Sequence, residues 1–276
     1  VFARRGDVLH GKDIEDVHQM RVAIRRLRSA LYDFSKFFEQ TLLETSKKDL
    51  KRLADALGKA RDNDVAVAAL EKLRKAAPEK FIRKQIRQRI SKKQCKRKEE
   101  QKILEEILDL SLIETMRGRF DTEIEHDFTR KSDEETLTVR QAGREIISKS
   151  LQEFGGLSPS LYEPFDCEHL HELRIAAKRL RYAVELFSEC WREKILPFAR
   201  EIAQMQDFLG EIHDQDLWIA NTGERLRRTS GKKHRANLWL LAQFTKKRDK
   251  NYRASLELWS RWQKRGFIHE LQNVTN

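Results

Sequence analysis

A seventeen-residue pattern that begins with histidine occurs twice in this chain, at residues 18–34 and again at residues 171–187. Eight positions are identical in the two copies, and four of these are the histidine and three arginines. A duplicated hydrophobic core would need only its apolar positions to be repeated. The pattern therefore indicates a duplicated cationic surface, and the planar guanidinium of arginine is well suited to bidentate contacts with phosphate.

The two copies supply the candidate anion-binding residues, which we call the first and second cationic rows. Their members share a helical spacing that keeps most of them away from the apolar positions, with Arg26, Arg28 and Arg179 toward the flanks. Arg26 and Arg179 are placed to contact a neighbouring helix instead. The first row is His18, Arg21, Arg25, Arg26 and Arg28, and the second is His171, Arg174, Lys178, Arg179 and Arg181.

Like charges dominate the first row, with no acidic residue between Asp16 and Asp33. A helix that stabilises its own solvated surface usually mixes signs, because like charges one turn apart repel each other. Near phosphate, the pKa of His18 or His171 should rise, so each would add a charge or a hydrogen-bond donor. A histidine bonded to a nearby carboxylate is the structural alternative for each of them alone.

Further cations follow in residues 79–98, which hold ten basic residues and one acid. Arg83 and Arg87 from this segment, together with Lys51, are weaker candidates for the same anion. A bound polyanion would offset the repulsion among these side chains.

Composition narrows the class of protein. The 276 residues carry a net charge of +12, which implies an anionic partner such as nucleic acid, an acidic membrane surface or polyphosphate. Three cysteines without a CxxC pair argue against a disulfide framework and fit a reducing cytosol. No signal peptide is evident, and uncharged runs of about nine residues are too short to cross a bilayer. We expect a cytoplasmic protein.

An all-α fold is expected, because 36% of residues are charged, only 11 are Gly and 4 are Pro, and no segment alternates with a period of two. The repeat predicts two halves, residues 1–130 and 131–276. Helices are expected at 13–39, where Asp13 would cap the first turn, 46–59, 63–77 and 79–117, with a connector at 118–132. The second half should hold helices at 133–153, 166–191, 194–210, 214–228 and 231–264, with a loop at Gly155 and Gly156.

A second repeated block supports the duplication, with Leu57-Gly58 followed by Asp62 and Asp64, and Leu209-Gly210 followed by Asp214 and Asp216. The glycines are predicted to end helices, and the aspartates to cap the next helices or to pair with arginines of the cationic rows. A metal or general-base role for these aspartates is less favoured.

Catalytic and metal-binding motifs are not found. Cys167, His169 and His171 lack standard zinc spacing, so we expect no metal site. The sequence has no Walker A, GxGxxG, HExxH or GxSxG motif, and no nucleophile paired with a base. We expect no cofactor and no enzymatic activity. The five tryptophans all lie in the second half and are predicted to be core residues.

With both repeated blocks in view, the chain resembles the CHAD domain family over residues 10–265. The resemblance implies two four-helix bundles of long antiparallel helices related by pseudo-twofold symmetry, with a basic groove or pore between them. It also implies binding of inorganic polyphosphate, association with polyphosphate granules, and partnership with CYTH-type triphosphatases. His213 departs from the repeat, because the first half has Arg61 at that position.

The leading hypothesis is therefore a non-enzymatic protein that binds polyphosphate through Lys, Arg and His side chains of both rows. A helical nucleic-acid-binding protein, a metal-dependent enzyme of phosphate metabolism using Asp62 and Asp64, and a scaffold for an acidic protein are the alternatives. No recognition-helix motif or stacking platform supports nucleic acid.

Overall fold

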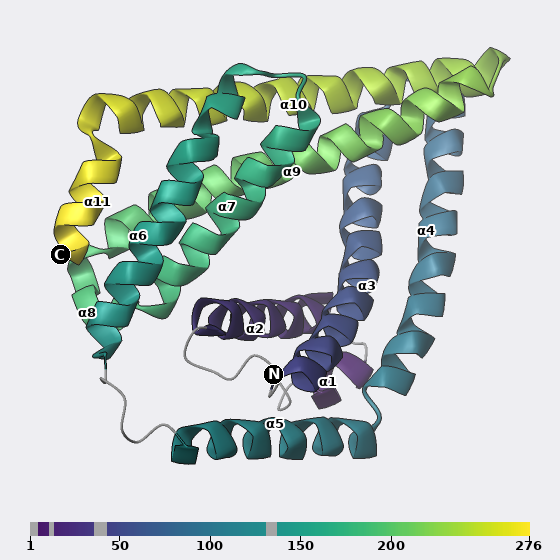
Figure 1. Cartoon of the computed structure of the whole chain (residues 1–276). Helices are drawn as coiled ribbons and strands as arrows, with labels where there is room; N and C mark the ends of the chain where they lie inside the picture. Colours follow the sequence, from purple (N-terminus) through teal and green to yellow (C-terminus); the bar gives the residue numbers. More distant parts are fainter. Residues whose placement is uncertain (1–4, 11–13, 36–42, 131–136) are drawn as a thin grey trace. The chain divides into compact units, whose positions relative to one another are not determined.

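The computed structural model describes residues 5–10, 14–35, 43–130 and 137–276, and this part of the chain is helical without any β-strand (Figure 1). The all-α prediction is confirmed. The chain divides into two compact units, Val1–Glu135 and Thr136–Asn276. The arrangement as two symmetry-related four-helix bundles stays a prediction, and the Asp13 cap lies outside the described residues.

The described residues of the first unit form five helices, α1 (Arg5–His10), α2 (Ile14–Asp33), α3 (Glu44–Ala76), α4 (Lys80–Ile107) and α5 (Leu110–Arg130). α3 packs against both α2 and α4 (Figure 1). Met20 and Ile24 of α2 are fully buried in one core cluster with Leu53 and Leu57 of α3 and Leu104 of α4. The apolar stripe of α2 therefore fixes which of its faces points away from α3.

The expected helix end at Gly58 is wrong, because α3 runs through it without a break. Leu57 and Ala60 on either side are completely buried, so the packing of this turn outweighs the cost of an internal glycine, about 1 kcal/mol. Gly210 lies within a long helix in the same way. The nearby aspartates are consequently inside helices, and their predicted role as N-caps is wrong too.

The single helix expected at residues 79–117 is interrupted. Leu108 is fully buried and ends α4, and Asp109 then caps α5 by accepting hydrogen bonds from the backbone N–H groups of Ser111 (3.0 Å) and Leu112 (3.4 Å). The expected connector at 118–132 is largely helical, because α5 continues to Arg130. An aspartate followed by an apolar stripe is a helix-start signal that marks this break.

The second unit contains α6 (Val139–Leu157), the 3₁₀ helix η3 (Ser158–Tyr162), α7 (Cys167–Leu186), α8 (Ser188–Trp191), the 3₁₀ helix η4 (Arg192–Lys194), α9 (Leu196–Arg227), α10 (Gly231–Arg265) and α11 (Phe267–Thr275). α9 and α10 form a long hairpin, as α3 and α4 do in the first unit (Figure 1). The rings of Phe154, Trp259 and Trp262 meet edge to face at 5.8–6.2 Å.

The loop expected at Gly155 and Gly156 is wrong, since α6 extends through both to Leu157. Phe154, next to them, is buried against the tryptophans of α10, which holds this end of α6 in place. Three of the five tryptophans, Trp191, Trp259 and Trp262, are buried.

A close approach between α6 and the end of α7 gives a stability prediction. A Cβ added at Gly143 would lie 2.8 Å from two ring carbons of Phe187, which is itself buried. We expect Gly143→Ala to lower the free energy of unfolding of the second unit by about 1–3 kcal/mol through overpacking. Urea titration followed by circular dichroism measures this.

The matched control is Gly223→Ala in α9, where an added Cβ meets no atom within 4 Å. This variant should be more stable than the wild type by about 0.5–1 kcal/mol, because alanine is the better helix former. Equal effects of the two substitutions would contradict the contact between Gly143 and Phe187.

Candidate anion-binding site

α2 positions the first cationic row. Its apolar residues Val17, Met20 and Ile24 are buried, so the opposite face of the helix must carry the charges. His18, Arg21 and Arg25 are half-buried, whereas Arg26 and Arg28 on the flanks are exposed. The apolar face expected from the sequence is confirmed, but the residues expected opposite it are less exposed than Arg26 and Arg28 on the flanks.

Arg21 lies against α3 at Gly58. A Cβ added at Gly58 would be 4.0 Å from Nε of Arg21, and Nη2 of Arg21 is 3.9 Å from Oδ1 of Asp62. Asp62 therefore partners an arginine of the first cationic row. The pair is long and the Asp62 side chain is 72% exposed, so it contributes little to stability and leaves the guanidinium open to an anion.

His18 lies among positive charges. Burial lowers its pKa, and the nearby charges of Arg61, Arg25 and Arg21 lower it further, while Glu15 acts in the opposite direction. Nδ1 of His18 is buried and accepts or donates no hydrogen bond within the described part of the chain. The uncharged imidazole is therefore the resting form near neutral pH, and a bound phosphate would favour its protonation.

The equivalent site in the second unit contains two histidines. Nδ1 of His171 on α7 is 3.1 Å from Nδ1 of His213 on α9, and the ring centroids are 4.4 Å apart. His213 stands where the first unit has Arg61. Because of this difference, two imidazole rings lie against each other in the second unit. Burial, and then the charge of Arg174, lowers the pKa of both rings, that of His213 to about 4. One nitrogen must donate and the other accept, which requires that at least one ring is uncharged.

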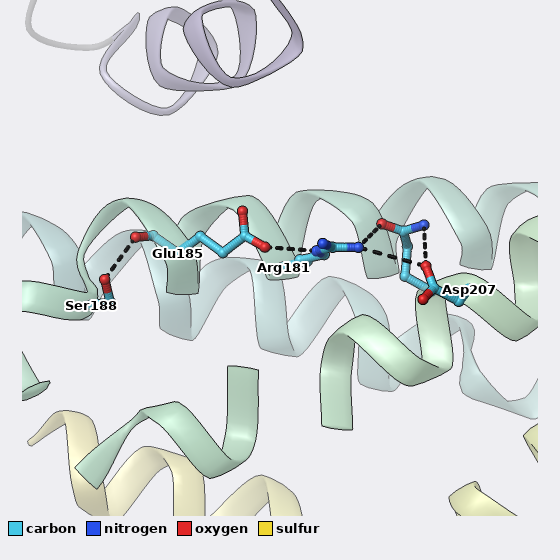
Figure 2. Close-up of polar contacts among 5 residues, drawn as sticks. Arg181, Glu185, Ser188 and Asp207 are labelled. Atoms are coloured by element: carbon cyan, nitrogen blue, oxygen red, sulfur yellow. Dashed lines mark hydrogen bonds and ion pairs between the residues drawn. The ribbon is translucent and has the colours of Figure 1, made fainter. Parts of the chain in front are cut away.

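Arg181, in the second cationic row, is held by side chains of its own unit (Figure 2). Its Nε donates to Glu185 at 2.7 Å and its Nη1 donates to Gln206 at 3.0 Å, with Asp207 at 3.6 Å. In the first unit, the residues at the positions of Glu185 and Gln206 are Tyr32 and Ala54, and Arg28 is exposed. Arg181 is therefore held by neighbouring polar side chains, whereas its counterpart Arg28 is exposed.

Arg179 forms an ion pair with Glu153 of α6. It therefore contacts a neighbouring helix, as expected from its position on the flank of α7. Arg83, a weaker candidate, donates to the backbone carbonyls of Ala77 (3.1 Å) and Pro78 (3.0 Å) and closes the turn between α3 and α4. Arg87 is exposed on α4, and Lys51 lines a groove between α3 and α4.

Two buried ion pairs were not predicted. Arg97 of α4 donates to Asp64 of α3 at 3.0 Å, and Arg248 of α10 donates to Asp216 of α9 at 2.5 Å. The four side chains are only 8–19% exposed. The common spacing of these arginines, 151 positions apart, is the sequence signal that would have revealed them.

Despite the bond to Arg97, burial raises the pKa of Asp64, because desolvation of the carboxylate outweighs the attraction of the guanidinium. The pair therefore joins α3 to α4, but burying the Asp64 carboxylate costs desolvation free energy. Arg248 and Asp216 form the corresponding pair in the second hairpin. The two halves are therefore also similar in α4 and α10, which lie outside both repeated sequence blocks.

Metal and membrane sites were also considered. Within the described ranges, no cluster of three or more His, Cys, Asp or Glu side chains is arranged to hold a metal ion. His169 instead contacts Asp166, the N-cap of α7, at 2.6 Å. In those same ranges, no helix combines the length and apolarity needed to cross a membrane.

Comparison with known proteins agrees with the fold. The family model described as CHAD domain matches residues 1–222. Among solved structures, PptA from Streptomyces chartreusis aligns with a TM-score of 0.62 at 14% identity, covering 94% of this chain and 96% of that one. No curated protein matches the sequence. At that identity the structural likeness concerns the fold alone.

The buried ion pair of the first unit gives a second stability prediction. Arg97→Gln leaves the Asp64 carboxylate buried without its charged partner, so we expect the first unit to lose about 3 kcal/mol of unfolding free energy. Arg97→Gln combined with Asp64→Asn should lose less, because no unpaired charge remains. The control is Arg117→Gln, whose pair with Asp121 is long (3.7 Å) and exposed, and which should change stability by less than about 0.5 kcal/mol. Chemical denaturation measures all three.

The histidine pair predicts a pH dependence. Because the pKa of His213 is about 4 in the folded protein and 6.5 ordinarily, the unfolded chain takes up a proton that the folded chain does not. Stability is then full above about pH 6.5 and falls as the pH drops toward 4. From about pH 7 to about pH 5.5, the wild type should lose about 1 kcal/mol more than His213→Gln.

His269→Gln, at an exposed histidine of α11, is the control and should follow the wild type. Identical pH profiles for His213→Gln and the wild type would contradict the buried histidine pair.

Proposed function

The chain belongs to the CHAD domain family, and from this premise we propose that it binds inorganic polyphosphate through the His, Arg and Lys side chains of its two cationic rows. The proposal is for binding without catalysis. Family resemblance adds the expectations of polyphosphate granules as the cellular location and a CYTH-type triphosphatase as a partner.

The observation that carries the proposal is the crowding of like charges at the α2–α3 contact. Helix packing brings His18, Arg21 and Arg61 together, and burial, followed by the charges of the nearby arginines, lowers the pKa of His18. Within the described part of the chain, Arg21 contacts the carboxylate of Asp62 only at the long distance of 3.9 Å. Such crowding costs stability unless an anion offsets it.

Arginine and histidine in this arrangement favour phosphate oxygens. Each guanidinium can donate two parallel hydrogen bonds to a phosphate, and a protonated imidazole adds a third charged donor. Arg21 and Arg25 are four residues apart, about 6 Å along α2, so they can meet successive phosphates of one chain. A single small anion would satisfy only part of the row.

The second row supports the proposal with His171, Arg174 and Lys178 at the same spacing. Burial is the main cause that lowers the pKa of His171, and the positive charges of Arg174 and Lys178 lower it further. Burial and neighbouring arginines lower the pKa of His18 in the first unit in the same way. If one long chain engages both rows, the second contact forms at high effective concentration and affinity rises with chain length.

The test is calorimetric titration of the full chain with long-chain polyphosphate at two salt concentrations. We expect affinity to fall steeply with salt, because bound cations release counterions from the polyanion. Replacing Arg21, Arg25, Arg174 and Lys178 by Ala should weaken binding by at least about 100-fold, since each charged hydrogen bond contributes about 1 kcal/mol or more.

The matched control removes four exposed cations elsewhere, two from each unit, by replacing Lys72, Lys75, Lys250 and Arg261 with Ala. It carries the same net charge and should bind nearly as the wild type does. Equal losses in both variants would mean that only net charge matters. Complete displacement of polyphosphate by RNA of equal charge would favour the nucleic-acid alternative.

A further inference from the structure

A groove between α3 and α4 lies outside the two cationic rows. It has a volume of about 340 Å³ and carries four basic side chains of α3, Lys48, Lys51, Arg52 and Lys59. Ile103 and Ile107 of α4 contribute an apolar wall, and Asp55 and Glu100 are the acidic residues that line it. The basic side chains thus outnumber the acidic ones two to one.

The groove adjoins the first cationic row on the surface of α3. Lys51 precedes Gly58 by seven residues, two helical turns, and so lies on nearly the same stripe of α3 that Arg21 contacts at Gly58. Lys48 and Lys59 lie a quarter turn further around α3, toward α4. A polyanion leaving Arg21 would therefore meet Lys51 and then the groove.

The second unit does not repeat most of the cations of this groove. By the offset of 152 that relates Gly58 to Gly210, the positions of Lys51, Arg52 and Lys59 correspond to Ala203, Gln204 and Glu211 in α9. Glu211 forms an ion pair with Lys247 of α10 at 2.6 Å. Lys48 alone keeps a basic counterpart, Arg200.

Three of the four cations of the groove are therefore present in the first unit alone, unlike the cationic rows, which occur in both units. The cationic rows show a related difference. Arg28 in the first unit is exposed, whereas its counterpart Arg181 in the second unit donates hydrogen bonds to Glu185 and Gln206. At the positions of the groove, the first unit thus carries more cations than the second.

We propose that the α3–α4 groove is a second anion-binding site, confined to the first unit, that takes the phosphates of a polyphosphate chain beyond those held by the first cationic row. Lys48 and Lys59 are eleven residues apart, about 17 Å along α3, so the groove accommodates several consecutive phosphates. Ile103 and Ile107 give the groove one apolar side. This inference rests on the proposed function and deepens it.

The consequence is a dependence on chain length. Tripolyphosphate held by the first cationic row is too short to extend into the groove, whereas a long chain held there occupies both. The test is the full chain with Lys51, Arg52 and Lys59 replaced by Gln, titrated with long-chain polyphosphate and with tripolyphosphate. We expect about tenfold weaker binding of the long chain, equivalent to about 1.4 kcal/mol, and unchanged binding of tripolyphosphate.

The control replaces Lys72, Lys75 and Lys92 by Gln, which removes the same charge from exposed positions of α3 and α4. A second, gain-of-function variant, Ala203→Lys with Gln204→Arg, places cations at the corresponding positions of α9 and should tighten long-chain binding. Thermal unfolding followed by circular dichroism verifies that all variants fold.

The outcomes separate this inference from the proposed function. Unchanged long-chain affinity in the groove variant, alongside the loss expected in the cationic-row variant, overturns the groove and leaves the function standing. Equal weakening for both probes also overturns it, because the groove would then act only through overall charge. A wild-type chain that binds neither polyphosphate nor tripolyphosphate overturns the proposed function itself.

Discussion

The packing of an apolar helix stripe against a long helical hairpin is the interaction on which the candidate site depends. Burial of Met20 and Ile24 against Leu53 and Leu57 fixes the rotation of α2 on α3. With that rotation fixed, Arg21 must lie at Gly58. The hydrophobic contact thus supplies the free energy that holds like charges together, since burying one such side chain contributes about 1.5–3 kcal/mol.

An ion pair with little solvent exposure joins the two helices of each hairpin. Arg97 with Asp64, and Arg248 with Asp216, place one buried ion pair at corresponding points of the two units. Buried pairs of this kind contribute less to stability than to specificity, because desolvation consumes most of the attraction. Each pair joins the two helices of its hairpin, α3 to α4 in the first unit and α9 to α10 in the second.

The two units do not carry equal charge at corresponding positions of the sequence pattern. In the second unit, Glu185 and Gln206 hold Arg181, His213 replaces the arginine beside the leading histidine, and Ala203 and Gln204 replace two cations. Each change removes or neutralises positive charge while the hydrophobic contacts persist. Charge on a solvated face can change without disturbing the core, because the two belong to opposite sides of the same helix.

The sequence by itself determined the helical class, the two cationic rows and their apolar backing, because helical periodicity is a local property that residues three and four apart reveal. Only the tertiary structure decided that Gly58 and Gly210 lie inside helices, and that Asp64 and Asp216 face arginines 33 and 32 residues away instead of capping a helix. It also decided that His171 meets His213. These outcomes depend on which helices pack together, and burial across such contacts outweighs the local preference of a glycine or an aspartate.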